Sequence, residues 1–184
     1  SNQLSIDFYI EIEKDNKTNK YIEIYDNTKG PTKYYKCLLY VNNIVNNTNH
    51  LPELFRKEYN DHFTYITIKD QIITDKYGTI ITDKSVVEFT YNSELPINYR
   101  WIPLKVRLDK TETIRKYTKN YGNNSLTAYY IWEIINNPIS FDDINILSTN
   151  KYTQYIEILK QKIQTTKQTN GKYYEQKTGL ALSM

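Results

Sequence analysis

The clearest chemical pattern in the chain lies in residues 101–110, where a strand-like alternation of apolar and polar side chains runs into an Arg-x-Asp-Lys cluster. Successive side chains of a strand point to opposite faces. The pattern therefore predicts that Lys105, Arg107 and Asp109 share one face, with Lys110 directly after them. Cations held in place by a carboxylate are typical of a site for phosphate groups.

Basic residues gather around this cluster. From Tyr99 to Lys119, seven Lys and Arg residues accompany two acidic ones, whereas from Ser1 to Asp26, six acidic residues accompany three basic ones. The formal net charge of the whole chain is only +3, which by itself does not indicate nucleic-acid binding. The local excess favours an anionic ligand, although charge taken alone more often marks a solvated basic surface.

Composition predicts a folded protein of ordinary size. The chain has 184 residues, 39% of them hydrophobic, and 19 tyrosines, which fits one domain or a small domain with a helical appendage. Cys37 is the sole cysteine, so an intramolecular disulfide and a cysteine-based metal site are excluded and a reducing compartment fits. No apolar run is long enough to span a bilayer and no leader precedes the first strand, so we expect a cytoplasmic protein without a membrane partner.

Alternation and turn residues predict a β-rich first part of the chain. The expected strands cover Leu4 to Ile12, Tyr21 to Tyr25, Tyr34 to Val41, Tyr65 to Ile73, Thr79 to Ile81, Ser85 to Tyr91 and the run from Trp101. The second of these is expected to form a hairpin with the first. Residues 42–59 are rich in Asn and are expected to form a long loop, with a short helix at Glu53 to Lys57, that could act as a mobile flap.

Helical signals begin after the basic cluster. Ser125 can cap a helix over Leu126 to Asn136, and an apolar stripe predicts another helix over Tyr152 to Ile163. We therefore expect a mainly β fold with a helical extension: an OB-fold-like small β-barrel over residues 1–112, followed by C-terminal helices over residues 113–184.

Other candidate sites have simpler structural explanations. Glu11 and Glu13 lie on one strand face and could hold Mg²⁺ or Mn²⁺, although a solvent-facing strand edge explains them better. His50 and His62 lack companions at ligand spacing. Several tyrosines on strands could form a platform for stacking bases, although barrel packing is the commoner role for such residues; they are Tyr34, Tyr35, Tyr40, Tyr65 and Tyr91. Helical spacing favours packing for Tyr129, Tyr130 and Trp132.

The run Trp101 to Lys110 resembles the last conserved motif of mRNA-capping guanylyltransferases, which belong to the lysine-nucleotidyltransferase superfamily. Ser5-Ile6-Asp7-Phe8 looks like the strand at the junction of the nucleotidyltransferase and OB domains, and Gly78 with Ser85 to Phe89 looks like the strand before the last motif. Further segments are similar to the linker of multifunctional capping enzymes of large DNA viruses; they are Lys110-Thr111-Glu112, Tyr121 to Asn124, Ala128, Trp132 and Asn137-Pro138-Ile139.

The resemblance implies that an enzyme lysine attacks GTP, that pyrophosphate leaves, and that GMP passes to an RNA 5′ end, with Mg²⁺ or Mn²⁺ in the whole enzyme. Arg107 and Lys110 would face the leaving phosphates, Asp109 would orient these two cations, and Lys105 would add positive potential. No Lys-x-Asp-Gly element occurs in the chain, so the chain alone cannot carry GMP.

The implied neighbours are a nucleotidyltransferase domain upstream and a cap methyltransferase downstream, and the implied location is the cytoplasm, a viral factory or a virion. Two alternatives stay open at this point. One is a stand-alone OB-type module that binds RNA or a protein. The other is a metal-dependent RNA 5′-triphosphatase that uses Glu11 and Glu13.

Overall fold

A computed structural model describes residues 4–137 together with Glu157 and Gln161. Residues Ser5–Asn124 form one compact unit, and helix α2, Ser125–Asn136, belongs to another. Helix α2 confirms the predicted helix, and its aromatic residues are buried, as expected for packing. Most of the predicted helix from Tyr152 lies outside the described residues. No helix in the described part of the chain combines the length and apolar character needed to cross a membrane.

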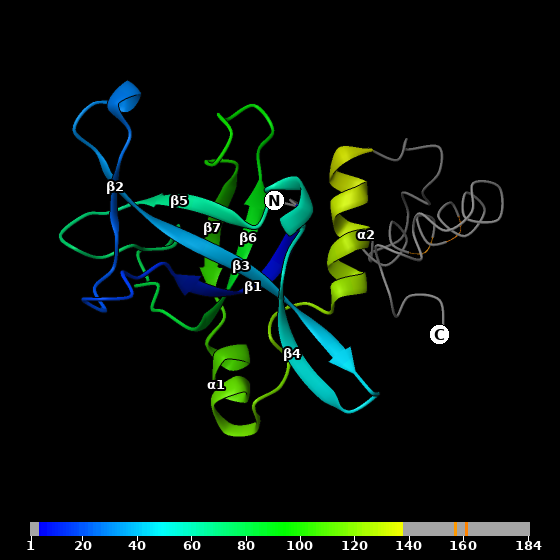
Figure 1. Cartoon of the computed structure of the whole chain (residues 1–184). Coiled ribbons are helices and arrows are strands. Elements are labelled where there is room, and N and C mark those ends of the chain that lie inside the picture. Colours follow the sequence, from blue (N-terminus) through cyan, green and yellow to red (C-terminus); the bar gives the residue numbers. More distant parts are fainter. Residues whose placement is uncertain (1–3, 138–156, 158–160, 162–184) are drawn as a thin grey trace. The chain divides into compact units, whose positions relative to one another are not determined.

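The unit Ser5–Asn124 is built on an antiparallel sheet of seven described strands (Figure 1). The strands are β1 (Ser5–Ile12), β2 (Glu23–Tyr25), β3 (Lys33–Val45), β4 (Asn49–Leu54), β5 (Phe63–Thr67), β6 (Ser85–Tyr91) and β7 (Trp101–Val106). Their order is β2-β3-β1-β6-β7, and β4 and β5 also pair with the long β3. The sheet curls into a half-barrel, which confirms the mainly β, OB-fold-like prediction.

The core lies around β1, because this strand is paired on both sides and its apolar residues are fully enclosed. The ring of Phe8 lies 5.0 Å from that of Trp101, edge to face, and 5.1 Å from that of Phe55. Such aromatic pairs add roughly 0.5–1.5 kcal/mol each beyond the burial of their surface. The core therefore fixes β1 and β7 relative to each other, and these two strands carry or adjoin the polar residues discussed below.

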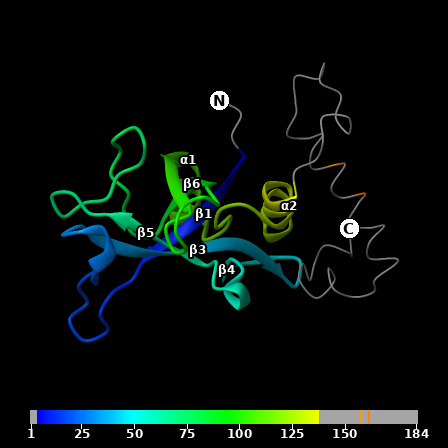
Figure 2. The ribbon, with the colours of Figure 1, turned by 90° about the horizontal axis from the view of Figure 1, so that it is seen from above.

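Four predictions of strands and loops were wrong in detail. Residues 42–59 are not a loop: β3 continues to Val45 and pairs with β4, a hairpin that extends from the rest of the sheet (Figure 2). The second predicted strand is shorter and pairs with β3, because β3 and β6 occupy both edges of β1; the expected hairpin is limited to an isolated bridge between Tyr21 and Lys14, just beyond the first strand. The predicted strand from Tyr65 ends at Thr67, and residues near Ile80 make only an isolated bridge to Thr74.

Short 3₁₀ helices complete the unit, at Asn27–Lys29 and at Lys57–Tyr59. The second replaces the helix expected at Glu53 to Lys57, because β4 runs through the first part of that range.

The most important difference concerns the opening cluster. Strand β7 ends at Val106, and helix α1, Leu108–Tyr117, begins directly after Arg107. Asp109 and Lys110 are therefore in the first turn of a helix, and the prediction that Asp109 shares a strand face with Lys105 was wrong. The carboxylate of Asp109 is favourable in the first turn of a helix, because it interacts with the positive N-terminal end of the helix dipole.

Candidate phosphate-binding site

The strand-to-helix junction at Arg107 is held rigidly by the neighbouring strand β6. The backbone N–H of Arg107 donates to the carbonyl of Val86 at 2.8 Å. The hydroxyl of Thr111, in a residue only 2% exposed, accepts from the backbone N–H of Val86 and donates to the carbonyl of Arg107, both at 2.9 Å. Thr111 thus ties the first turn of α1 to β6, and this fixes the direction in which the Arg107 side chain leaves the backbone.

A buried carboxylate anchors the other side of the junction. Asp75 accepts a hydrogen bond from the backbone N–H of Val106 at 2.9 Å through one oxygen. Its other oxygen accepts from the N–H groups of Tyr77 and Thr79 at 2.8 and 2.9 Å. Because both oxygens are engaged by the backbone, Asp75 fixes the end of β7 rather than serving a ligand.

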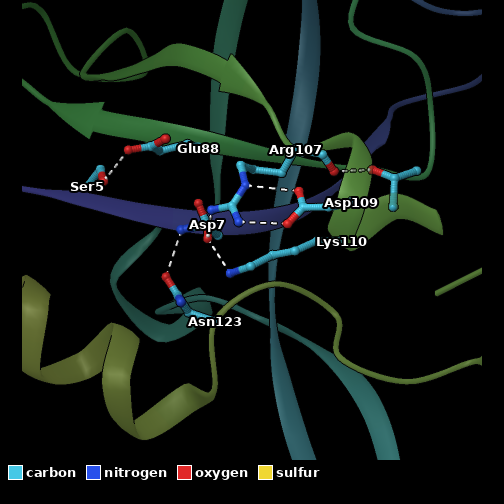
Figure 3. Close-up of polar contacts among 8 residues, drawn as sticks. Ser5, Asp7, Glu88, Arg107, Asp109, Lys110 and Asn123 are labelled. Carbon is cyan, nitrogen blue, oxygen red and sulfur yellow. Dashed lines mark hydrogen bonds and ion pairs between the residues drawn. The ribbon is translucent and has the colours of Figure 1, made fainter. Parts of the chain in front are cut away.

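Arg107 and Lys110 both reach back to Asp7 in the middle of β1 (Figure 3). Nη1 of Arg107 donates to Oδ2 of Asp7 at 3.0 Å, and the ammonium of Lys110 donates to the same oxygen. The side chain of Asp7 is 9% exposed, against 28% for Arg107 and 29% for Lys110. A nearly buried carboxylate therefore holds two partly exposed cations side by side.

Arg107 makes a second, two-pronged contact with Asp109. Its Nε donates to Oδ1 of Asp109 at 3.2 Å, and its Nη2 donates to Oδ2 at 3.0 Å. These hydrogen bonds hold the pKa of Asp109 at about 2, well below its ordinary value, and they raise the pKa of Arg107. The side chain of Asp109 is 67% exposed. A bidentate anionic ligand can therefore take the place of this carboxylate on Arg107 without uncovering a buried group.

Lys105 and Arg107 line one surface depression of about 400 Å³, together with Glu88 and Asp109. Lys105 lies opposite Glu88 in the β6–β7 register, and Glu88 accepts a hydrogen bond from the hydroxyl of Ser5 at 2.6 Å. Lys110 is not among the residues that line this depression and is directed to Asp7 instead. The structure thus places Lys105, Arg107 and Asp109 around one depression, while Lys110 meets Arg107 at Asp7.

The segment after α1 fixes the position of Asp7. The backbone N–H of Asp7 donates to Oδ1 of Asn123 at 2.7 Å, and the N–H of Asn123 donates to the carbonyl of Asp7 at 2.8 Å. Gly122 has a left-handed φ of +76°, and a Cβ atom there would lie 2.4 Å from the carbonyl oxygen of Asp7. Only a glycine lets this segment approach β1 so closely.

Sequence reasoning did not identify Asp7, Thr111 and Asp75 as residues that position the site. Asp7 was visible only as part of a strand, because its partners are about a hundred residues away. The alternation places Asp7 on the polar face of its strand, so the sequence does not show that this carboxylate is buried and needs partners.

The proposed metal pair is not supported by the structure. The hydroxyl of Tyr40 donates to Glu11 at 3.2 Å, and the ammonium of Lys36 pairs with Glu13 at 3.3 Å. Strand β1 is also central, so the explanation of Glu11 as an edge residue was wrong. Within the described residues, no three His, Cys, Asp or Glu side chains converge on a point where they could hold a metal ion, so these residues alone do not fit a Mg²⁺ or Mn²⁺ site.

Comparison with known proteins adds sequence evidence. Over 151 residues the chain is 40% identical to a protein of Acanthamoeba polyphaga mimivirus described as a "Probable mRNA-capping enzyme". The chain resembles a segment of a viral capping enzyme. The aligned part covers 79% of this chain but only 13% of the mimivirus protein. No protein-family model and no solved structure gives a significant match. The predicted resemblance to capping enzymes of large DNA viruses is confirmed by this relative.

Proposed function

We propose that this chain is the OB-fold-like part of an mRNA-capping guanylyltransferase, which closes over GTP and orients the pyrophosphate leaving group while GMP is transferred to the RNA 5′ end. The proposal is carried by one observation: Arg107 and Lys110 converge on the same oxygen of the buried Asp7. The similarity to a mimivirus protein described as a probable capping enzyme supports the same conclusion.

The chemistry assigns this chain a role at the leaving group. A lysine from outside the chain would attack the α-phosphorus of GTP, forming a phosphorus–nitrogen bond while the bond to the bridging oxygen breaks and pyrophosphate departs. Negative charge grows on the pyrophosphate, and fixed cations stabilise it without having to reorganise. A phosphate oxygen of the RNA 5′ end then attacks the same phosphorus and the lysine leaves, a step in which pyrophosphate takes no part.

Each residue of the site would have its own task. Arg107 would exchange its bidentate contact with the exposed Asp109 for a bidentate contact with a phosphate, while its contact with Asp7 keeps the guanidinium in place. Lys110 would contribute a second charge from the Asp7 side, and Lys105 would raise the positive potential of the depression. A domain that carries these groups must approach GTP for the first step and withdraw for the second. The complete enzyme would use Mg²⁺ or Mn²⁺, whose ligands are expected outside the described residues.

The test compares two arginines of the same segment in the capping enzyme that contains it. Arg107→Ala should slow covalent enzyme–GMP formation from radiolabelled GTP about 10²- to 10³-fold. Arg115→Ala should leave it unchanged, because Arg115 is exposed and pairs only with the neighbouring Glu112 at 3.3 Å among the described residues. Labelling of the Arg107→Ala protein at the wild-type level would overturn the proposal.

A further inference from the structure

A second depression of about 390 Å³ lies elsewhere on the Ser5–Asn124 unit and is lined by aromatic rings, cations, and aliphatic and threonine side chains. Its wall includes Tyr34, Tyr65 and Tyr99, with Lys29 and Lys69 beside them. Among the described residues that line it there is no Asp or Glu. The combination of ring surface and positive charge is distinct from the Arg107 site, which contains carboxylates.

The three tyrosines form one edge-to-face cluster rather than scattered packing contacts. The ring of Tyr99 lies 5.2 Å from that of Tyr34 and 5.4 Å from that of Tyr65. Tyr34 is buried and forms the base of the cluster, whereas Tyr65 and Tyr99 are partly exposed. The planes of the Tyr65 and Tyr99 rings meet at 83°, so one planar ligand can stack on one of these rings while the other flanks it edge-on.

The position of Tyr99 is fixed by a hydrogen bond. Its hydroxyl donates to Oδ2 of Asp26 at 2.6 Å, and the other oxygen of Asp26 accepts from the backbone and the hydroxyl of Thr28. The ammonium of Lys29 lies 4.0 Å from the centre of the Tyr99 ring. A cation already rests on this aromatic surface, so a ligand that offers both a flat ring and an anionic group can satisfy the tyrosines and the lysine together.

We propose that this depression binds a nucleobase of single-stranded RNA, with the base stacked on the partly exposed ring of Tyr65 and the adjoining phosphates contacted by Lys29 and Lys69. Aromatic platforms flanked by cations bind single strands without strict sequence preference, because every base has a stacking face and every linkage a charge. The inference rests on the proposed function, in which this chain meets the RNA 5′ end, and it assigns the RNA a surface separate from the pyrophosphate site.

Binding can be measured on the 184-residue chain by fluorescence anisotropy with a short labelled oligouridylate. Affinity should fall between about 50 and 200 mM salt, as expected for phosphate contacts. Tyr65→Ala should weaken binding roughly 5- to 100-fold, whereas Tyr65→Phe, which keeps the ring, should bind like the wild type. Thermal unfolding of the Tyr65→Ala chain shows whether the loss reflects the site or the fold.

A pair of lysines provides a test that does not depend on the core. Lys69→Ala, in an exposed turn, should weaken binding and reduce the slope of log affinity against log salt by about 0.7. Lys116→Ala, an exposed cation on α1, should change neither. Wild-type binding by both Tyr65→Ala and Lys69→Ala, an equal loss in Lys116→Ala, or no binding by the wild type would overturn the inference. If the depression binds a protein segment instead of RNA, the wild-type chain will not bind the oligouridylate. Since the assay contains no GTP, its failure leaves the enzyme–GMP test of Arg107 unaffected.

Discussion

Nη1 of Arg107 lies 3.0 Å from Oδ2 of Asp7, a residue one hundred positions earlier in the chain. The contact joins the central strand of the sheet to the strand-to-helix junction that carries the basic cluster. Since Lys110 donates to the same oxygen, the position of both cations depends on one nearly buried carboxylate. Asp7 is therefore the positioning residue of the site, and the first prediction concerns it.

Asp7→Asn should lower the free energy of unfolding by about 1–3 kcal/mol, because two cations lose a charged hydrogen-bond acceptor. The matched control is Asp109→Asn, which removes the other carboxylate that contacts Arg107. Asp109 is largely exposed, so its loss should cost no more than about 1 kcal/mol. Urea denaturation of both variants measures the difference, and equal effects would mean that burial of Asp7 does not strengthen its contacts.

Thr111→Val should destabilise the chain by about 1–3 kcal/mol, because the buried N–H of Val86 would lose its acceptor. The substitution keeps the size and branching of the side chain and removes only the hydroxyl. Thr111→Ser keeps the hydroxyl and should retain the hydrogen bonds, with a smaller loss from the missing methyl group. Thermal unfolding of the two variants should rank serine above valine; the reverse order would argue that packing dominates at this position.

Gly122→Ala and Gly78→Ala form a matched pair, since both glycines have a left-handed φ near +80°. Alanine should cost about 1–2 kcal/mol at either position from backbone strain. At Gly122 its Cβ would also meet the backbone of Asp7 and Tyr9, whereas at Gly78 nothing lies within 4 Å. Gly122→Ala should therefore lose roughly 1–3 kcal/mol more. Equal denaturation midpoints for the two variants would contradict the close approach of the segment to β1.

Alkaline pH should destabilise the fold partly through Tyr40. Burial, and then the charge and hydrogen bond of Glu11, raise the pKa of Tyr40 from its ordinary value of 10 to about 12. The folded state holds this proton more tightly than the unfolded state, so the contribution to stability is complete below pH 10 and is lost as the pH rises to about 12.

Tyr40→Phe should reduce this alkaline loss, although other buried tyrosines such as Tyr9, whose pKa is also raised by burial, will keep part of it. Tyr77→Phe is the control, because Tyr77 is largely exposed. Urea midpoints compared between about pH 8 and pH 11 test the difference. A steeper alkaline loss in Tyr40→Phe than in the wild type would contradict the assigned sign.

The strands that the sequence predicted best are those whose apolar residues recur without interruption. The strands over Ser5–Ile12 and Ser85–Tyr91 were recognised with nearly correct bounds, and the strand from Trp101 with its correct start, since β-branched and aromatic residues are frequent in them. The β3–β4 hairpin was missed because its outer strand is exposed and polar. Asn46 and Asn47, both left-handed, were the available turn signal.

Helix α1 was missed because the alternation of the preceding strand continues through Arg107, Leu108 and Asp109 in the sequence. The helix has Thr111 as its single buried residue, so its sequence contains no apolar stripe that would predict a helix. The residues of the candidate phosphate site were singled out in the sequence by their chemical types. Their geometry could not, because it depends on Asp7 and on the segment at Gly122, which pairing across the sheet brings together only in the folded chain.

The most direct test of the central claim is to measure the two half-reactions separately for Arg107→Ala in the capping enzyme that contains this segment. Enzyme–GMP formation expels pyrophosphate, whereas transfer of GMP to RNA does not. We predict that the rate of the first step falls about 10²- to 10³-fold, as for loss of one fixed donor to a developing charge, while transfer from the GMP-enzyme that does form falls far less. Equal losses in both steps, or no loss in the first, would contradict the assignment of Arg107 to the leaving group.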